Sequence, residues 1–416
     1  MYSSEKYKPI SISLSPNVQD DDVILSSKLL FQPWKWKNGK AIKRLEESFA
    51  KYLGVKYAIS LNSGRSSLFA ILKSLDLSEN SDVLLQAFTC NAVPNPILWS
   101  NLNPVYVDCN NNFNIDIDDL KNKITINSKV LIVQHTFGLP ANMDEIMHIA
   151  KENNVIVIED CAHALGAEWD HHKVGTFGDA AFFSFSRDKI ISSVYGGMAV
   201  TNDDQIAENL RKLQNEFGKP SYFWIFQQIL HPILLYLIVL PLYNFLDLGK
   251  LFLIFSQLLH ILSKAVSWKE KRGLKPDYFP KSLPNALAIM SLNQFNKLGY
   301  FNEHRKKIAE FYYDNLSNTK FVLPKKDGNI FLRFAIQHPQ AHKLIYESWH
   351  KENMLLGDWY TTPIAPDDTK LEKLKYKIGM CNTAEKLSKV TLNLPTHINI
   401  KPEDAERIVN FLKKFI

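Results

Sequence analysis

Three polar residues in the middle of the chain have the types and the order that one organic cofactor requires. Asp160 ends the apolar run VIVIED, and Ser184 and Lys189 follow in FFSFSRDK. A strand that ends in a carboxylate places it at the carboxyl edge of a parallel sheet, where open α/β folds bind their ligands. A lysine can form a Schiff base with an aldehyde, an aspartate can keep a pyridine nitrogen protonated, and a hydroxyl can bind a phosphate. This combination favours pyridoxal 5′-phosphate as the cofactor.

A second polar segment, residues 62–67 (NSGRSS), stands between a strand pattern and a helix pattern. Gly64 allows a close backbone approach, the helix N-terminus attracts an anion, and small hydroxyls such as that of Ser66 add donors. The segment lacks the GK[ST] ending of a Walker A loop. It is a candidate phosphate cradle, although a plain helix N-cap has the same composition. His163, three residues after Asp160, is a candidate for the same pocket or an interior histidine.

Neither a metal site nor a disulfide framework is expected. The cluster Asp170, His171 and His172 has no further ligands at useful spacing, so we interpret it as a polar hairpin turn. The N-terminal stretch 1–16 has no apolar core of a signal peptide. The cysteines are widely spaced and form no CxxC pair, which favours a reducing cytoplasm. They are Cys90, Cys109, Cys161 and Cys381.

Strand and helix patterns alternate between about residues 40 and 215. The amphipathic segment 41–53 ends at Gly54, a natural helix stop. Alternation of this kind predicts parallel βαβ units, with a mostly parallel sheet covered by helices. A helical pattern at 292–316, followed by mixed patterns, predicts a smaller α+β C-terminal domain. The strand patterns lie at 55–61, 83–88, 104–108, 129–135 and 155–160.

The overall composition is that of an enzyme-sized globular protein. The 416 residues are 46% hydrophobic and 22% charged, which excludes a disordered or fibrous protein. The net charge of +6 is too small and too dispersed to indicate nucleic acid as a partner. A mean hydropathy of −0.16 excludes a polytopic membrane protein.

One long apolar insert departs from this average. Residues 222–246 carry no charge, and a second apolar run at 251–262 is shorter than the roughly 20 residues that span a bilayer. Pro232 and Pro241 interrupt a straight helix, and an odd number of crossings would separate the two halves of the fold. With basic residues on both flanks, these features favour a monotopic, re-entrant membrane contact through residues 222–263. A buried core hairpin and an oligomer surface are the alternatives.

The motifs occur in the same order in a known family. They are NSGRSSL, FTCNAVPNPI, PVYVDCN, HTFGLPANMDEI, VIEDCAHALGA, VGTFGDAAFFSFSRDK, GGMAVTND and LNLP. The chain resembles the DegT/StrS-type sugar aminotransferases, fold-type I enzymes that depend on pyridoxal phosphate. The resemblance covers roughly residues 30–218 and 274–416. We therefore expect a large cofactor-binding α/β domain at 1–218, the apolar insert at 219–273, and a helix plus a small α+β domain at 274–416.

The resemblance implies a role for each matching residue. Lys189 matches the Schiff-base lysine, Asp160 the partner of the pyridine nitrogen, and His163 the residue near the phenolic oxygen of the cofactor. These three form the expected catalytic set, and Gly64 and Ser184 match positions that bind the phosphate. The expected cofactor-binding set is Gly64, Arg65, Ser66, Cys90, Asp160, His163, Ser184 and Lys189.

Three positions depart from the family pattern. Cys90 stands where an aromatic residue often stacks on the cofactor ring, and Tyr195 replaces a usual glutamate. Pro280, with Lys281 beside it, falls near the asparagine that the neighbouring subunit usually donates to the phosphate. These departures affect the expected sugar specificity and the cofactor contacts, not the Schiff-base chemistry.

The implied activity is transfer of an amino group, from a donor such as glutamate, to a keto-sugar for surface polysaccharide or lipopolysaccharide synthesis. The resemblance also implies a nucleotide carrier and a homodimer, and we expect the protein in the cytoplasm, on the cytoplasmic face of the membrane. Some relatives carry histidine at the position of Lys189 and act as dehydratases, so the lysine favours transamination. A pyridoxal-phosphate dehydratase and a non-catalytic membrane scaffold on the same fold remain alternatives, and a polyprenyl lipid carrier is also open.

Overall fold

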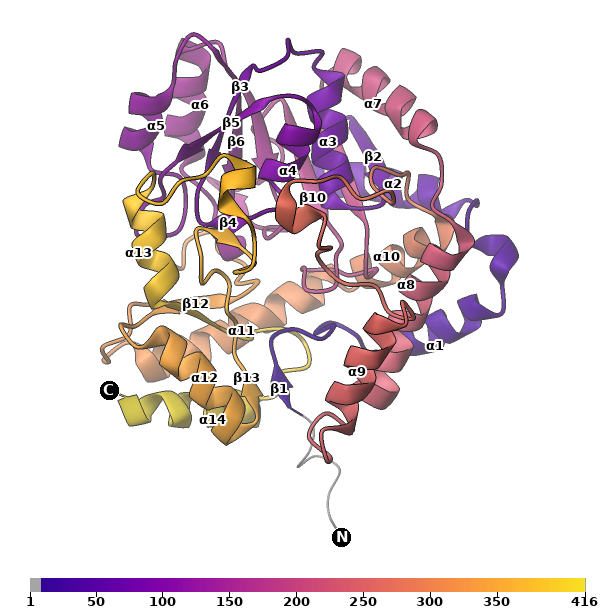
Figure 1. The fold of residues 1–416 in the computed structure, drawn as a ribbon, viewed down its shortest axis with the longest axis vertical. Coiled ribbons are helices and arrows are strands. Elements are labelled where there is room, and N and C mark those ends of the chain that lie inside the picture. The colour runs from indigo at the N-terminus through magenta and orange to yellow at the C-terminus, as the bar shows by residue number, and fades with distance from the viewer. Residues whose placement is uncertain (1–8, 416) are drawn as a thin grey trace.

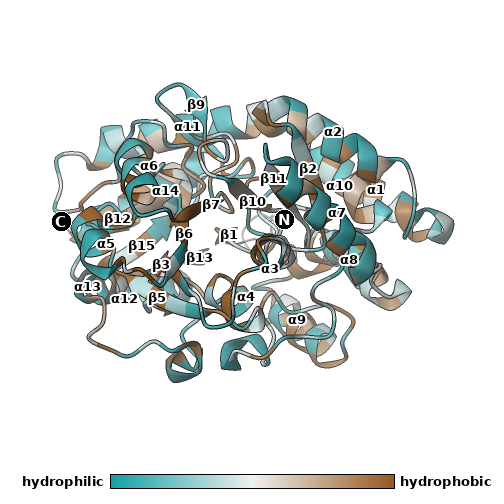
Figure 2. Cartoon of the chain, turned by 90° about the horizontal axis from the view of Figure 1, so that it is seen from above, coloured by the Kyte–Doolittle hydropathy of each residue, from teal (hydrophilic) through white to brown (hydrophobic). Residues whose placement is uncertain are grey.

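A central sheet organises the first half of the chain in the computed structural model, which describes residues 9–415. Within these residues the sheet has seven strands, in the order β2-β11-β10-β7-β6-β3-β5 (Figure 2). Only the two pairings of β11 are antiparallel, and all the others are parallel. The strands are β2 (Tyr57–Leu61), β3 (Asp82–Gln86), β5 (Asn103–Val107), β6 (Ser128–Gln134), β7 (Ile156–Asp160), β10 (Ala180–Ser184) and β11 (Gly197–Thr201).

Both faces of this sheet are apolar. Successive side chains of a strand point to opposite faces, and in these strands the side chains on both faces are mostly apolar. In β3, Val83 and Leu85 pack into one helix layer, and Leu84 packs into the other. The first layer contains α3 (Gly64–Ser74), α4 (Pro94–Trp99) and α7 (Asp204–Phe217). The second contains α2 (Ala41–Leu53), α5 (Ile117–Lys123), α6 (Met143–Glu152) and α10 (Asn285–Phe295). The predicted mostly parallel sheet covered by helices is confirmed.

Two local predictions have different outcomes. Helix α2 ends at Gly54, whose φ of +79° is the left-handed cap that glycine adopts most readily. The prediction of one helix over 292–316 is wrong, because α10 ends at Phe295 and α11 (Leu298–Leu316) follows a two-residue break. Phe295 stacks on Phe49 of α2 at 5.3 Å, whereas α11 packs on α14 (Pro402–Leu412). The two helices that replace the predicted single helix therefore pack against different neighbours.

A smaller mixed layer forms the C-terminal part, as the sequence predicts. Strand β12 (Phe334–Gln337) pairs antiparallel with β15 (Thr391–Leu394), and α11, α12 (Ala341–Glu352) and α14 cover it. Strand β1 (Ile10–Ser11) pairs in parallel with β13 (Met354–Leu355), which joins the N-terminal segment to this part (Figure 1).

The predicted hairpin turn around Asp170 is confirmed. Strands β8 (Glu168–Trp169) and β9 (His172–Lys173) are antiparallel, and the two residues between them have φ of +44° and +62°. Positive φ at both central residues is typical of two-residue hairpin turns that match the twist of the strands.

The apolar insert folds as a helix pair beside the sheet domain. Helix α8 (Tyr222–Leu234) packs on α1 (Asp20–Leu30) and continues into one π-helical turn, Leu235–Val239. Helix α9 (Leu248–Leu258) packs on that turn (Figure 1), where a Cβ at Gly249 would lie 2.3 Å from the Val239 carbonyl oxygen. Among the described residues, one helical stretch, Tyr222–Val239, is long and apolar enough to cross a membrane, and half of it is buried inside the protein.

Candidate active site

The carboxyl ends of β2, β3, β7 and β10 meet at one edge of the sheet and open on a cavity of about 420 Å³. This volume is in the range of small-molecule sites, about 300–1,000 Å³. The cavity brings together seven of the eight predicted cofactor-binding residues: Gly64, Arg65, Cys90, Asp160, His163, Ser184 and Lys189. Ser66 is not among the described residues that line it; its hydroxyl donates to Oδ1 of Asn62 at 2.7 Å.

Lys189 presents an amine with no hydrogen bond or ion pair among residues 9–415, and its Nζ lies 4.6 Å from the ring centre of Trp359. Burial lowers the pKa of Lys189 to about 8, although Cys90 and Asp160 oppose this shift. Burial raises the pKa of Asp160 to about 6, although the N–H of Ala162, which donates to Oδ1 at 3.0 Å, favours the carboxylate. The cavity therefore pairs a lysine that can lose its proton near neutral pH with a carboxylate that is ionised there.

The main chain at Lys189 is held from behind by Asn17. Nδ2 of Asn17 donates to the carbonyl oxygens of Lys189 and Ile190, at 2.5 and 3.0 Å. Nη2 of Arg305 donates to Oδ1 of Asn17 at 2.8 Å, and both of these side chains are buried. The lysine therefore projects from a fixed backbone.

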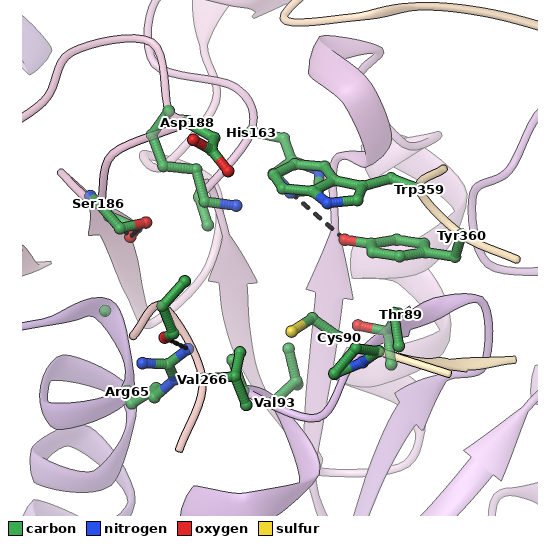
Figure 3. A pocket seen from close by; sticks show the side chains of 18 of the residues that line it. Arg65, Thr89, Cys90, Val93, His163, Ser186, Asp188, Val266, Trp359 and Tyr360 are labelled. Atoms are coloured by element: carbon green, nitrogen blue, oxygen red, sulfur yellow. Dashed lines mark hydrogen bonds between the residues drawn. The ribbon is translucent and has the colours of Figure 1, made fainter. Parts of the chain in front are cut away.

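His163 forms a flat wall of the cavity. Its ring stacks between Phe137 and Trp359, with centroids 5.9 and 5.2 Å away. Nδ1 accepts the N–H of Phe137 at 3.3 Å, and Nε2 lies 3.4 Å from the hydroxyl of Tyr360 (Figure 3). Burial lowers the pKa of His163 well below its ordinary value, so the ring is neutral. Because both faces of the ring are covered, the neutral imidazole can contact a ligand only through its edge.

The N-terminus of α3 forms the opposite, polar end of the cavity. Ser63 caps the helix by accepting the N–H of Ser66 at 3.0 Å, and Gly64 is the first helical residue. A Cβ at Gly197 of β11 would lie 2.4 Å from the backbone of Ser63, so glycine is needed for this close approach. Helix N–H groups, hydroxyls and the side chain of Arg65 together suit a phosphate.

The three departures from the family pattern have different positions. Cys90 lines the cavity, and burial raises the pKa of its thiol. Tyr195 also lines the cavity, and its hydroxyl donates to the carbonyl of Lys264. Pro280 does not line it among the described residues, and the N–H of the adjacent Lys281 donates to Oδ1 of Asn62 at 3.1 Å. This segment supports the turn before α3 from within the same chain.

A buried group of potential metal ligands, His135, Glu159 and Cys161, lies outside the cavity lining. Nε2 of His135 lies 3.1 Å from Glu159, and its Nδ1 accepts the N–H of Ala141. The carboxylate of Glu159 accepts three further backbone N–H groups, at 2.7 to 2.9 Å, from Gly175, Phe177 and Gly178. These bonds fix the loop after the hairpin, and no metal is needed to explain the group.

Sequence reasoning missed several cavity residues. Trp359 and Tyr360 come from the C-terminal part, and their aromatic pair in GDWYTTP was the only local signal. Arg187 and Asp188 stand directly before Lys189, in a motif whose pattern predicts cofactor contacts for its serine and lysine alone. Ala265 and Val266 come from the end of the apolar insert, for which no site role was expected. Figure 3 shows Arg65 and Val266 on one side of the cavity, with Trp359 and Tyr360 on the other.

The sequence profile of the DegT/DnrJ/EryC1/StrS aminotransferase family matches residues 21–224 and 271–413. The chain belongs to this family. The interruption of the match, residues 225–270, falls in the apolar insert. Aminotransferases of this family use pyridoxal 5′-phosphate, so the predicted family, fold and cofactor are confirmed.

Individual relatives support the same family. A GDP-perosamine synthase of Escherichia coli O157:H7 is 34% identical over 199 residues, which are 48% of this chain and 54% of that protein. The chain spans about half the length of the first curated relatives that it matches. The aminotransferase PseC of Helicobacter pylori, involved in pseudaminic acid biosynthesis, has the same fold, with a TM-score of 0.76 and 22% identity over 98% of this chain and 99% of that one. An E. coli GDP-4-keto-6-deoxy-D-mannose-3-dehydratase with bound hydrated pyridoxal phosphate also has it, with a TM-score of 0.75 and 20% identity over 97% and 99%.

The residues present fit the cofactor. The amine of Lys189, which has no hydrogen-bond partner among residues 9–415, lines the cavity together with Asp160, Ser184 and the first turn of α3 at Ser63 and Gly64. These groups come from three different strand ends, and the sheet alone brings them together.

Proposed function

We propose that this protein is a pyridoxal-phosphate-dependent aminotransferase that transfers an amino group from glutamate to a nucleotide-linked keto-sugar. The product would enter the assembly of a surface polysaccharide or lipopolysaccharide. The single observation that carries the proposal is that the amine of Lys189, the carboxylate of Asp160 and the glycine turn at Gly64 line one cavity.

Each side chain of the cavity has a separate role in the proposed reaction. Pyridoxal phosphate, when bound, supplies the aldehyde for the covalent link and the ring that accepts electrons. Nζ of Lys189, with a pKa of about 8, is suited to remove and return a proton at the reacting carbon. The carboxylate of Asp160 would hold a proton on the pyridine nitrogen, and the neutral imidazole of His163 would lie near the phenolic oxygen of the cofactor, as the family resemblance implies. Ser63, Ser184 and the first turn of α3 would bind the phosphate.

The substrate class rests on the relatives and on the charge of the cavity. The name of the E. coli O157:H7 relative contains a GDP-linked amino sugar. Arg65 and Arg187 line the cavity, and guanidinium groups bind phosphate oxygens well. Glutamate as the donor and a homodimer are proposed from the family resemblance, together with a cytoplasmic location.

We place the protein at the cytoplasmic face of a membrane because of the outward side of α9. Leu251, Ile254, Phe255 and Leu258 recur there with helical spacing and are 45 to 62% exposed. A helix at a water-facing surface normally carries polar residues on that side. The 11 residues of α9 reach about 16 Å, less than the roughly 30 Å hydrocarbon core, so the helix suits an in-plane position. Exposed Lys264 nearby would face anionic headgroups.

The test is a complete reaction with purified protein, pyridoxal phosphate, glutamate and a panel of nucleotide-linked keto-sugars. Formation of 2-oxoglutarate together with an amino sugar supports transamination. Loss of a hydroxyl group from the sugar, with no release of 2-oxoglutarate, would instead support the dehydratase alternative. A protein that binds neither cofactor nor sugar would support the scaffold alternative.

A further inference from the structure

The apolar insert returns to the sheet domain along the wall of the cavity. Arg187, two residues before Lys189, donates twice to Ser263, the fifth residue after α9. Nη1 donates to the carbonyl oxygen at 3.0 Å, and Nη2 donates to the hydroxyl at 2.9 Å. A guanidinium held by two bonds has a fixed orientation.

The next two residues make contacts of the same kind. The carbonyl of Lys264 accepts the hydroxyl of Tyr195, and the carbonyl of Ala265 accepts Nη2 of Arg65 at 3.1 Å. Three consecutive carbonyls thus hold three different side chains that line the cavity. Val266 then faces the cavity itself, beside Arg65 (Figure 3).

Ser263 is in turn fixed by the first helix of the insert. Its hydroxyl donates to Oε1 of Gln228 at 2.8 Å while it accepts from Arg187. Gln228 is fully buried in α8, and its Nε2 donates to the carbonyl of Trp224 at 2.8 Å. A continuous path of hydrogen bonds therefore leads from Gln228 of α8, through Ser263, to the guanidinium of Arg187, which lines the cavity.

We propose that the returning segment of the insert, residues 263–266, completes the active site from within the same chain, with Ser263 as the positioning residue for Arg187. The group that Arg187 recognises is a phosphate, carried by the cofactor or by the nucleotide-linked sugar. This inference rests on the proposed function. It also assigns a role to residues that lie in the interruption of the family match, at 225–270.

The first test is the substitution Ser263→Ala. It keeps the contact of Arg187 with the carbonyl oxygen of residue 263 and removes the contact of Arg187 with the hydroxyl. Because a hydrogen bond to a charged group is worth more than a neutral one, we expect phosphate affinity to fall about tenfold, with kcat within about twofold. A rise in the dissociation constant of pyridoxal phosphate would identify the cofactor as the source of the phosphate. A rise in KM for the sugar nucleotide alone would identify the substrate. Ser263→Thr keeps a hydroxyl and restores the lost affinity.

A matched control and a second variant keep the result clear. Ser256→Ala changes a buried serine of α9 whose hydroxyl donates, among the described residues, only to the carbonyl of Leu253, so it leaves both constants unchanged. Gln228→Leu removes the support of the Ser263 hydroxyl and acts in the same direction as Ser263→Ala. If Ser263→Ala and Gln228→Leu, both folded, leave both constants at the wild-type values, the proposal is wrong.

A binding measurement that needs no catalytic turnover tests the role of Ser263 independently of the proposed aminotransferase activity. Pyrophosphate binding to the protein free of cofactor is measured by calorimetry, and Ser263→Ala weakens it about tenfold. That weakening supports the role of Ser263 even if no keto-sugar is aminated. Equal pyrophosphate affinity in wild type and Ser263→Ala would overturn the role even if the enzyme transaminates.

Discussion

Nε of Arg65 lies 2.9 Å from Oε1 of Glu270, and the two side chains are 12% and 0% exposed. This ion pair joins the first turn of α3 to the end of the apolar insert. Burial opposes the charge on Arg65, but the carboxylate of Glu270 raises the pKa of the guanidinium above its ordinary value. The phosphate end of the cavity is thus tied to the insert by a buried pair of opposite charges.

Removing the carboxylate of this pair is expected to destabilise the fold. Glu270→Ala leaves the guanidinium of Arg65 buried without its partner, and breaking a buried pair in this way costs about 3–5 kcal/mol. Asp368→Ala is the control, because it breaks an exposed pair with Lys271, which is worth about 1 kcal/mol or less. Urea unfolding measures both values, and equal losses in the two variants would contradict the prediction.

The amine of Lys189 is expected to control how fast the cofactor attaches. Only the neutral amine reacts, and its fraction rises with pH until the pKa of about 8 is passed. The attachment rate, followed by visible absorbance, therefore rises from pH 6, reaches half of its maximum near pH 8 and levels off above about pH 9. Asp188→Asn moves this midpoint to lower pH, because the Asp188 carboxylate raises the pKa of Lys189. A midpoint near the ordinary lysine value of 10.5 would contradict the account.

The close approach at Gly197 is expected to be necessary for the phosphate cradle. In Gly197→Ala the new Cβ would meet the backbone of Ser63 at 2.4 Å, so the first turn of α3 must move. We expect the dissociation constant of pyridoxal phosphate to rise about tenfold or more, since helix N–H groups act only at short range. Gly299→Ala in α11 is the matched control, since a Cβ there meets nothing within 4 Å. Equal cofactor affinity in both variants would show that the cradle tolerates the change.

The outward face of α9 is expected to carry the membrane contact. Ile254→Glu with Leu258→Glu places two charges on this face and should abolish flotation with anionic phospholipid vesicles, because charges resist burial in lipid. Ile126→Glu changes an isoleucine that is more exposed than Ile254, 89% against 53%, in the loop between α5 and β6, and it should leave flotation unchanged. Wild-type protein that does not float, or a double variant that changes only the oligomeric state in light scattering, would contradict the membrane proposal and favour an oligomer surface.

Local rules explain why much of the sheet domain was predictable. Polar residues at strand ends, such as Asp160 and Ser184, must gather at one edge once the strands are parallel. The pattern before α3 carried both the capping serine, Ser63, and the glycine beside it. The motif order then identified the family, which fixed the role expected for Lys189.

Long-range contacts explain what the sequence did not reveal. Trp359 and Tyr360 reach the cavity only because the C-terminal part folds over the sheet edge, and no spacing along the chain encodes that contact. The break after Phe295 depends on the separate neighbours of α10 and α11. Ser263 looked like the end of an apolar run, and its contact with Arg187 is visible only in three dimensions.

The most direct test of the central claim compares wild type with Lys189→Ala in the presence of pyridoxal phosphate and glutamate. We expect the wild type to show a visible absorption band that glutamate abolishes, with one equivalent of 2-oxoglutarate released for each cofactor bound. Lys189→Ala should show neither the band nor the release. A colourless wild type, or a Lys189→Ala protein that keeps both signals, would contradict the account.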